Sequence, residues 1–170
     1  SIENLYKWNY SFIKDLNTVP DPELKKIVDS LINGITEEKT KAIKIYQWVQ
    51  NHVRYVAFEN GLEGFRPRQA KEICAKRYGD CKDMSSIITQ MMRMAGIKAY
   101  YTWIGTRTLP YTYTETPLPI VDNHMISTAW INDTWMFFDG TDPNATYDMP
   151  PEMIQGKQAL VSIDENQYKI

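Results

Sequence analysis

Apolar residues near the start of the chain recur every three or four positions, which is the spacing of amphipathic helices. Between residues 4 and 16, one predicted face carries Leu5, Trp8, Phe12 and Leu16. A second helix is predicted to begin at Asp21, because aspartate is a favourable N-cap and the following Pro22 suits the first helical turn. Gly34 is expected to end that helix, since glycine readily adopts the left-handed conformation found after many helices.

A third helix is predicted from Thr36, as its cap, to the region of His52. Its apolar face carries Ala42, Ile45, Trp48, Val49 and His52. The place of His52 on that face predicts a buried core histidine rather than a reactive one. Residues 1–52 are therefore expected to form a helical scaffold.

The most regular helical pattern in the chain begins at Cys81. Apolar side chains recur at helical spacing, and Gly96 follows them: the set is Met84, Ile87, Ile88, Met91, Met92 and Ala95. We expect a central core helix whose methionines fill the core rather than form a binding face. The loop residues Gly79 and Asp80 precede it, which puts the Cys81 thiol at the N-terminus of the helix.

The rest of the chain favours strands and short elements. A short β-rich run covers residues 53–58, and a short helix is predicted around Ile73 and Cys74. Beyond Gly96, strands are predicted at 97–106, 124–131 and 134–139, with a tight turn at Asn132-Asp133. The tail suggests a short helix after Pro150-Pro151 and an edge strand at 159–163. Helices followed by meander strands predict an α+β fold with helices packed on an antiparallel sheet.

Length, composition and charge narrow the class of protein. The chain has 170 residues, 43% hydrophobic and 24% charged, which suits one globular domain with a substantial core. It contains no apolar run long enough to span a membrane. The net charge is −2 and the basic residues are scattered among acids, which argues against nucleic acid as a partner. The chain opens on Ser1 instead of methionine, consistent with a processed protein or with part of a longer chain.

The candidate chemistry centres on Cys81. The positive end of the helix dipole and the unpaired amides of the first turn stabilise a thiolate there, so Cys81 is a plausible nucleophile. The alternative is a buried inert cysteine, and Cys74 keeps that interpretation because it lies on a predicted helix face. The two cysteines could also form one disulfide or a redox pair. Two cysteines and two histidines are too few for a closed zinc site, so no metal or cofactor is expected.

A thiol nucleophile needs a general acid and base, and His124 is the better candidate of the two histidines. It opens a predicted strand directly after a loop, where its ring can face a cleft. The next strand ends at Asp139, and the two strands are similar in length, so Asp139 is expected opposite His124 as the orienting carboxylate. Asp142 is the rival, but Pro143 follows it and favours a turn.

These residues lie in three blocks: YGDCKDMSSIITQMMRMAGIKAYY from position 78, DNHMISTAWI from 122 and TWMFFDGTDP from 134. The order of cysteine, histidine and aspartate in them resembles the transglutaminase-like superfamily, which shares its core with papain-like cysteine proteases. The resemblance covers about residues 53–143. It implies a single domain over residues 1–170, with the helical scaffold at 1–52, the catalytic core at 53–143 and a C-terminal extension at 144–170.

The resemblance implies that Cys81 is the nucleophile, His124 the general acid and base, and Asp139 the residue that fixes the imidazole tautomer. The oxyanion would be met by the backbone N–H of Cys81 and one further donor, for which Tyr55 and Gln69 are candidates. Two departures separate the chain from relatives in the superfamily: it has no acidic loop with calcium-ligand spacing, and no paired Cys-x-x-Cys zinc motif. The residue after the histidine is Met125, where a small residue is common.

The function expected is that of a thiol-dependent acyl-transfer enzyme acting on peptide or side-chain amides, with hydrolysis favoured over transfer to an amine. The alternative is a noncatalytic module that binds a peptide or glycan through the loop at 106–122, which is rich in Tyr, Thr and Pro. The expected partner is a protein or peptide substrate. The resemblance favours an extracytoplasmic location, periplasmic or secreted, in a bacterial protein.

Overall fold

A five-stranded antiparallel sheet forms the centre of the fold in the computed structural model, which describes residues 1–57 and 64–170. The strands lie in the order β5-β4-β3-β6-β7. Their bounds are Lys98–Ile104 (β3), His124–Ile131 (β4), Thr134–Phe138 (β5), Ala159–Ser162 (β6) and Tyr168–Lys169 (β7). A separate parallel pair joins β1 (Arg54–Tyr55) to β2 (Tyr78–Gly79), so the β-rich run predicted at 53–58 supplies only two strand residues among those described.

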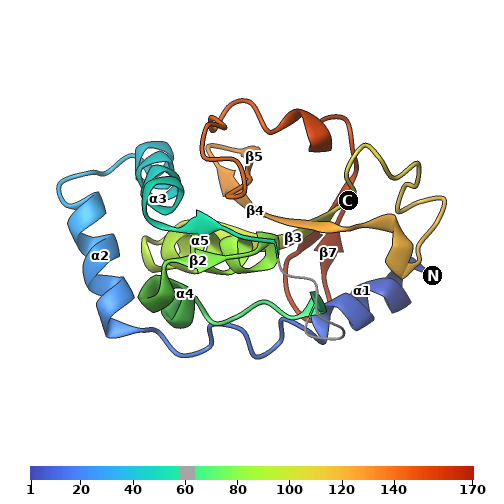
Figure 1. Cartoon of the computed structure of the whole chain (residues 1–170), viewed down its shortest axis with the longest axis horizontal. Helices are drawn as coiled ribbons and strands as arrows, with labels where there is room; N and C mark the ends of the chain where they lie inside the picture. Colours follow the sequence, from blue (N-terminus) through green and yellow to red (C-terminus); the bar gives the residue numbers. More distant parts are fainter. Residues whose placement is uncertain (58–63) are drawn as a thin grey trace.

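The helices are α1 (Ile2–Tyr10), α2 (Pro22–Ile32), α3 (Glu38–His52), α4 (Ala70–Lys76) and α5 (Cys81–Met94). Short 3₁₀ turns include η2 (Pro119–Val121) and η3 (Glu152–Ile154). Figure 1 shows α2, α3 and α4 gathered around α5 at one end of the molecule, whereas α1 lies at the other end, near β7. The predicted α+β architecture is confirmed.

Most predicted helix ends are correct, and the differences have local causes. Asp21 caps α2, since its carboxylate accepts a hydrogen bond from the Leu24 N–H at 3.0 Å. Gly34 follows α2 at a φ of +74°, as expected of a helix-ending glycine. The first helix, however, ends at Tyr10 instead of continuing to 16, and the turns that follow still bury Leu16.

The third helix corrects two expectations. Its N-cap is Glu37 and not Thr36, and no side chain caps it. His52 is exposed rather than buried, because the buried face of α3 runs through Tyr46, Val49 and the adjoining Val53 and leaves His52 beside it. The His52 ring instead stacks on Trp48, with the ring centroids 4.7 Å apart.

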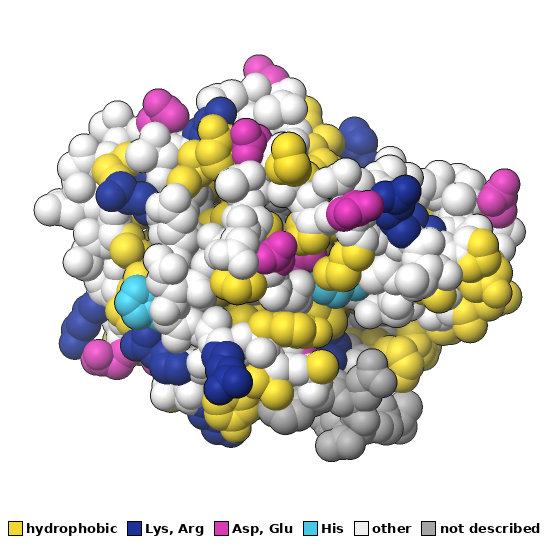
Figure 2. Space-filling model, turned by 45° about the horizontal axis from the view of Figure 1, so that its top comes forward, with side chains coloured by type: hydrophobic (Ala, Val, Ile, Leu, Met, Phe, Trp, Pro, Cys, Tyr) yellow, Lys and Arg dark blue, Asp and Glu magenta, His cyan; other side chains and the backbone are white. Residues whose placement is uncertain are grey.

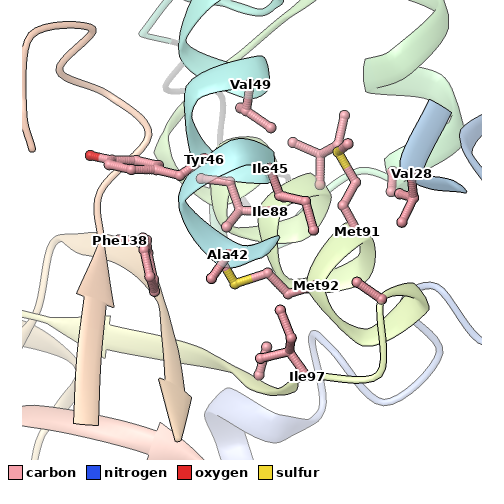
Figure 3. Packing of buried hydrophobic residues seen from close by; sticks show 14 of the residues in the cluster. Val28, Ala42, Ile45, Tyr46, Val49, Ile88, Met91, Met92, Ile97 and Phe138 are labelled. Carbon is pink, nitrogen blue, oxygen red and sulfur yellow. The ribbon is translucent and has the colours of Figure 1, made fainter. Parts of the chain in front are cut away.

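The central helix α5 is more enclosed than an amphipathic stripe requires. Every residue from Lys82 to Met92 is buried. One side packs on β3 and β4, and the other is covered by α2, α3 and α4. Figure 3 shows the apolar side of this packing, where Met91 and Met92 of α5 lie among Val28, Ile45 and Ile97. The expectation that the methionines fill the core is confirmed.

The C-terminal segment completes the sheet. The predicted strand at 159–163 appears as β6, but it is an interior strand because it pairs with both β3 and β7. The edge on that side is β7, and the helix expected after Pro151 is the single turn η3. In the part of the chain that the structure describes, no helix is both long and apolar enough to cross a bilayer.

Candidate active site

Cys81 is the first residue of α5, and the local sequence fixes this position. The Asp80 carboxylate accepts a hydrogen bond from the Asp83 N–H at 3.1 Å, and the Asp83 carboxylate accepts one from the Asp80 N–H at 3.0 Å. This reciprocal capping box starts the helix at Cys81. The Cys81 N–H therefore belongs to the first helical turn, whose amides have no partner within the helix.

A salt bridge behind the thiol holds this helix start in place. The Arg68 guanidinium donates two hydrogen bonds to Oδ2 of Asp83, at 2.8 and 3.1 Å, and the Arg68 N–H donates to Oδ1 at 2.9 Å. Burial raises the pKa of Asp83, but the Arg68 hydrogen bonds outweigh it and the net pKa is lowered. Gly79 is required here, because a Cβ at that position would lie 2.5 Å from the Asp83 Cβ.

We expect Asp83→Ala to lower the free energy of unfolding by about 3 kcal/mol, because it removes the buried carboxylate that accepts from the Arg68 guanidinium and from the Asp80 N–H. Urea denaturation measures this change. Asp29→Ala is the matched control, since it removes an exposed carboxylate paired with Lys25 and should cost about 0.5 kcal/mol or less. Equal effects of the two substitutions would contradict a stabilising role for the Arg68 salt bridge.

A seam of hydrogen bonds fixes α5 against β4 and thereby sets the distance between the thiol and the histidine. The Ser85 hydroxyl donates to the Ile126 carbonyl at 2.6 Å, and the Ser127 hydroxyl donates to the Ser85 carbonyl at 3.0 Å. Thr89 and Ser127 hydroxyls also pair at 2.7 Å. Because these groups are buried and satisfied, they fix the register of helix on strand.

His124 and Asp139 are joined by a hydrogen bond of 2.7 Å between His124 Nε2 and Asp139 Oδ2. The similar strand lengths predicted that the two residues lie directly opposite each other, and this prediction is wrong. The last ladder pair is Ser127 with Phe138, so the same register would place Asp139 opposite Ile126. Asp139 lies just beyond β5 and reaches His124 diagonally, which is within the span of side chains on adjacent strands.

The Asp139 carboxylate is held rigidly from its other side. Its Oδ1 accepts hydrogen bonds from the Thr141 N–H at 2.9 Å and the Thr141 hydroxyl at 2.7 Å. The buried Tyr46 hydroxyl donates to the Asp139 carbonyl at 2.6 Å. The next residue, Gly140, lets the chain pass close to α5, since a Cβ there would lie 2.8 Å from the Met84 Cβ. Asp139 therefore has a fixed orientation toward His124.

The electrostatics favour a charged imidazole. Burial by itself lowers the pKa of His124, but hydrogen bonds and charge interactions with Asp139 and Cys81 raise it to about 9. Burial likewise raises the pKa of Asp139, and the hydrogen bonds from His124 and Thr141 reverse this to a net lowering. Since Nε2 of His124 is bound to Asp139, Nδ1 is the ring nitrogen available to the Cys81 thiol. The arrangement can hold an imidazolium between a carboxylate and a sulfur.

A cavity of 480 Å³ opens beside these groups. Cys81, His124, Tyr55, Phe65, Trp103 and Asp122 are among its lining residues. Of the two candidates for a second oxyanion donor, Tyr55 therefore borders the cavity. Gln69 does not: its side chain accepts from the Asn17 N–H at 2.8 Å and donates to the Asp15 carbonyl at 3.3 Å, in a different surface pocket.

Cys74 is remote from this chemistry. It packs in the apolar cluster of α4 and α5, and burial raises the pKa of its thiol. Both cysteines are free. A larger cavity of 560 Å³ is lined by residues that include Ile126 and Phe137, but neither Cys81 nor His124 borders it. On the face in Figure 2, basic and acidic side chains are interspersed around a central band of hydrophobic ones.

Sequence patterns did not single out several residues that build this site. The pairing of Arg68 with Asp83 and the seam through Ser85 and Ser127 left no signal, because each joins segments distant in sequence. Asp122 could have been noticed, since a residue two positions before His124 in extended chain lies on the same side. Its carboxylate accepts a hydrogen bond from the Tyr113 hydroxyl at 2.8 Å and borders the same cavity.

Solved structures with the same fold are distant in sequence. A candidate protease from Parabacteroides distasonis superposes over 95% of this chain with a TM-score of 0.69 and 12% identity. A candidate cysteine protease from Cytophaga hutchinsonii covers 76% of this chain, with a TM-score of 0.55 and 22% identity. A structure named a TGase covers 84%, with a TM-score of 0.50 and 16% identity. The chain spans 29%, 44% and 38% of these proteins. Because their identities to this chain are only 12%, 22% and 16%, the likeness concerns the fold alone.

The sequence itself gives the firmest assignment. No curated protein matches the chain in a sequence search. Residues 25–140 match the family profile described as the Transglutaminase-like superfamily, and this match contains Cys81, His124 and Asp139. Since the match covers more than half of the chain and the fold agrees with it, the chain belongs to the transglutaminase-like superfamily.

Proposed function

We propose that this protein is a thiol-dependent acyl-transfer enzyme that acts on peptide or side-chain amides, with Cys81 as nucleophile, His124 as general acid and base, and Asp139 as the residue that orients His124. The observation that carries the proposal is the buried hydrogen bond between Asp139 and His124, beside Cys81 at the wall of a cavity. The superfamily and its neighbours described as candidate cysteine proteases agree with it.

The chemistry follows from these positions. The Cys81 thiolate attacks the carbonyl carbon of the amide and forms a C–S bond, and the electron pair moves to oxygen. When the tetrahedral intermediate collapses, the C–N bond breaks and the His124 imidazolium gives its proton to the departing amine. A thioester remains. Water then attacks the thioester, losing a proton to His124, and the carboxylic acid and the thiolate are released.

The oxyanion of the intermediate needs donors that are already oriented. The Cys81 N–H is suited to this task, since it lies in the first turn of α5 and next to its own thiol. Tyr55 is the proposed second donor because its side chain borders the cavity, whereas the amide of Gln69 is engaged with Asn17 and Asp15. Hydrolysis is favoured over amine transfer because water needs no dedicated binding site.

Alkylation by iodoacetamide tests the central pair of residues. We expect Cys81 to react faster than Cys74 near neutral pH, because the His124 imidazolium stabilises a thiolate at Cys81 while Cys74 is buried. His124→Ala should slow the Cys81 reaction about tenfold or more at that pH. Peptide mapping by mass spectrometry separates the two sites. An unchanged Cys81 rate in His124→Ala would remove the support for an ion pair.

Incubation with a mixed peptide library identifies the reaction. New peptide termini would indicate proteolysis, released ammonia would indicate deamidation, and crosslinked products would indicate amine transfer. Cys81→Ala is the control for each product. Absence of turnover on every amide would favour instead a noncatalytic module that binds peptides or glycans.

A further inference from the structure

A second carboxylate in the cavity wall, that of Asp122, has no role in the proposed triad. The residue joins η2 to β4 in extended conformation, with φ −129° and ψ 154°. Because residues two apart in extended chain project to the same side, Asp122 and His124 point the same way, with their α-carbons roughly 7 Å apart. Both border the cavity that also contains Cys81. A substrate group bound at Asp122 would thus lie beside the amide presented to the thiol.

The two described side chains that interact with the Asp122 carboxylate, those of Tyr113 and Asn9, are neutral. The Tyr113 hydroxyl donates to its Oδ2 at 2.8 Å. Asn9 of α1 is near enough to lower the pKa of Asp122, but its buried amide nitrogen completes no hydrogen bond with any described residue. Lys82 is the only lysine or arginine among the described residues that line this cavity, and its ammonium is paired with Asp80. The His124 imidazolium also borders the cavity, but its Nε2 is bound to Asp139. The described cations of this cavity are therefore each paired with another carboxylate.

An uncompensated carboxylate in a partly buried site is unfavourable, since burial penalises its charged form. Burial raises the pKa of Asp122 to about 6, against the lowering effects of the Tyr113 hydrogen bond and of the nearby Asn9 amide. The group is still mostly ionised at neutral pH. Anchoring the Tyr113 hydroxyl does not explain the charge, because a neutral amide oxygen accepts the same bond. A cation arriving from outside would remove the penalty.

We propose that Asp122 is a specificity-determining residue that binds a primary ammonium group of the substrate, next to the amide attacked by Cys81. The ammonium comes from a lysine side chain or from a peptide N-terminus, and both offer the same N–H donors to the carboxylate. Phe65 and Trp103 border the same cavity and supply apolar surface for the carbon chain that carries the ammonium. The inference rests on the proposed function for the meaning of "substrate", but its binding step can be measured without turnover.

Charge-matched thiol reagents measure that binding step. Cys81 is modified with 2-aminoethyl methanethiosulfonate and with its neutral isostere, propyl methanethiosulfonate, in a Cys74→Ala background, and both rates are followed by intact mass. We expect the cationic reagent to be favoured over the neutral one about tenfold more at Cys81 than at the thiol of a short cysteine peptide. No enrichment over the free peptide would overturn the ammonium site, whatever any variant does.

Variants then assign the effect to one carboxylate. Asp122→Asn keeps an acceptor for the Tyr113 hydroxyl and should abolish the enrichment, while the rate with the neutral reagent stays within about twofold. Tyr113→Phe should keep most of the enrichment because the carboxylate remains. Asp133→Asn removes a charge from the turn at the far end of the β4-β5 hairpin and should change nothing. Enrichment retained in Asp122→Asn would overturn the assignment.

Peptides distinguish the two sources of the ammonium once an amide substrate is known. Acetylation of the lysine side chain, or of the N-terminus, should lower kcat/KM about tenfold for the source that Asp122 binds, and Asp122→Asn should remove that difference. Enrichment of the cationic reagent without turnover of any peptide would uphold the ammonium site and reject the proposed catalysis. Turnover that is unchanged by Asp122→Asn and by both acetylations would uphold the proposed catalysis and reject the ammonium site.

Discussion

Replacing Cys81 by alanine should lower amide turnover by a factor of about 10³ or more, because no other thiol is among the described residues that line the cavity. The folded state should be retained, since the side chain is small and only partly buried at the first turn of α5. The measurement is kcat on the peptide or amide identified by the library screen, together with trapping of a thioester by mass spectrometry in the wild-type protein.

Cys74→Ala is the matched control for this experiment. Its thiol is buried in the apolar cluster of α4 and α5, so the substitution should lower the free energy of unfolding by about 1 kcal/mol and leave kcat nearly unchanged. Turnover that survives in Cys81→Ala but is lost in Cys74→Ala would reverse the assignment of the nucleophile. Loss in both would indicate that the second variant is misfolded, which circular dichroism reports.

Asp139→Asn should lower kcat/KM by about 10²- to 10⁴-fold, because an amide in place of the carboxylate no longer stabilises the imidazolium or fixes the ring tautomer. The pH profile should change as well. In the wild-type protein His124 keeps its proton up to a pKa of about 9, with Asp139 as a principal cause. The alkaline limb of kcat/KM should therefore move to lower pH in Asp139→Asn. A lower rate with an unmoved limb would mean that Asp139 is only structural.

The same pair should contribute to stability in a pH-dependent way. The pKa of His124 is raised to about 9 in the folded state, from about 6.5 when unfolded, so its contribution is complete below about pH 6.5 and is lost as pH rises through about 9. Asp139→Ala should cost about 3 kcal/mol or more at pH 6, since it leaves a buried imidazolium and the Thr141 donors unpaired. Urea denaturation of both proteins at pH 6 and near pH 10 should show this cost shrinking. A cost that grows with pH would contradict the ion pair.

Most of the fold could be predicted from the spacing of apolar residues and from the residues that form turns. The stripe from Met84 to Ala95 predicts α5, and Gly96 marks its end with a φ of +80°. Asn132 and Asp133 predict the β4-β5 hairpin, and both adopt the left-handed conformation there. These signals are local, which is why they could be read without the tertiary structure. His52 shows the opposite case, since its place in a helical pattern did not reveal that the buried face of α3 passes beside it, through Val49 and Val53.

The sequence by itself determined most of the helices and strands and their order. It also determined the three candidate residues of a thiol-dependent site: a cysteine after a capping turn, a histidine that opens a strand, and an aspartate that ends the next. These follow from backbone propensity, capping and side-chain period, which act over a few residues. Only the tertiary structure decided that Asp139 reaches His124 diagonally, that Gln69 lies in another pocket, and that Asp122 borders the same cavity as Cys81 and His124. Each of these depends on contacts between segments that are distant in the sequence. The packing of α5 on the sheet sets those distances, and such contacts produce no periodic pattern in the sequence.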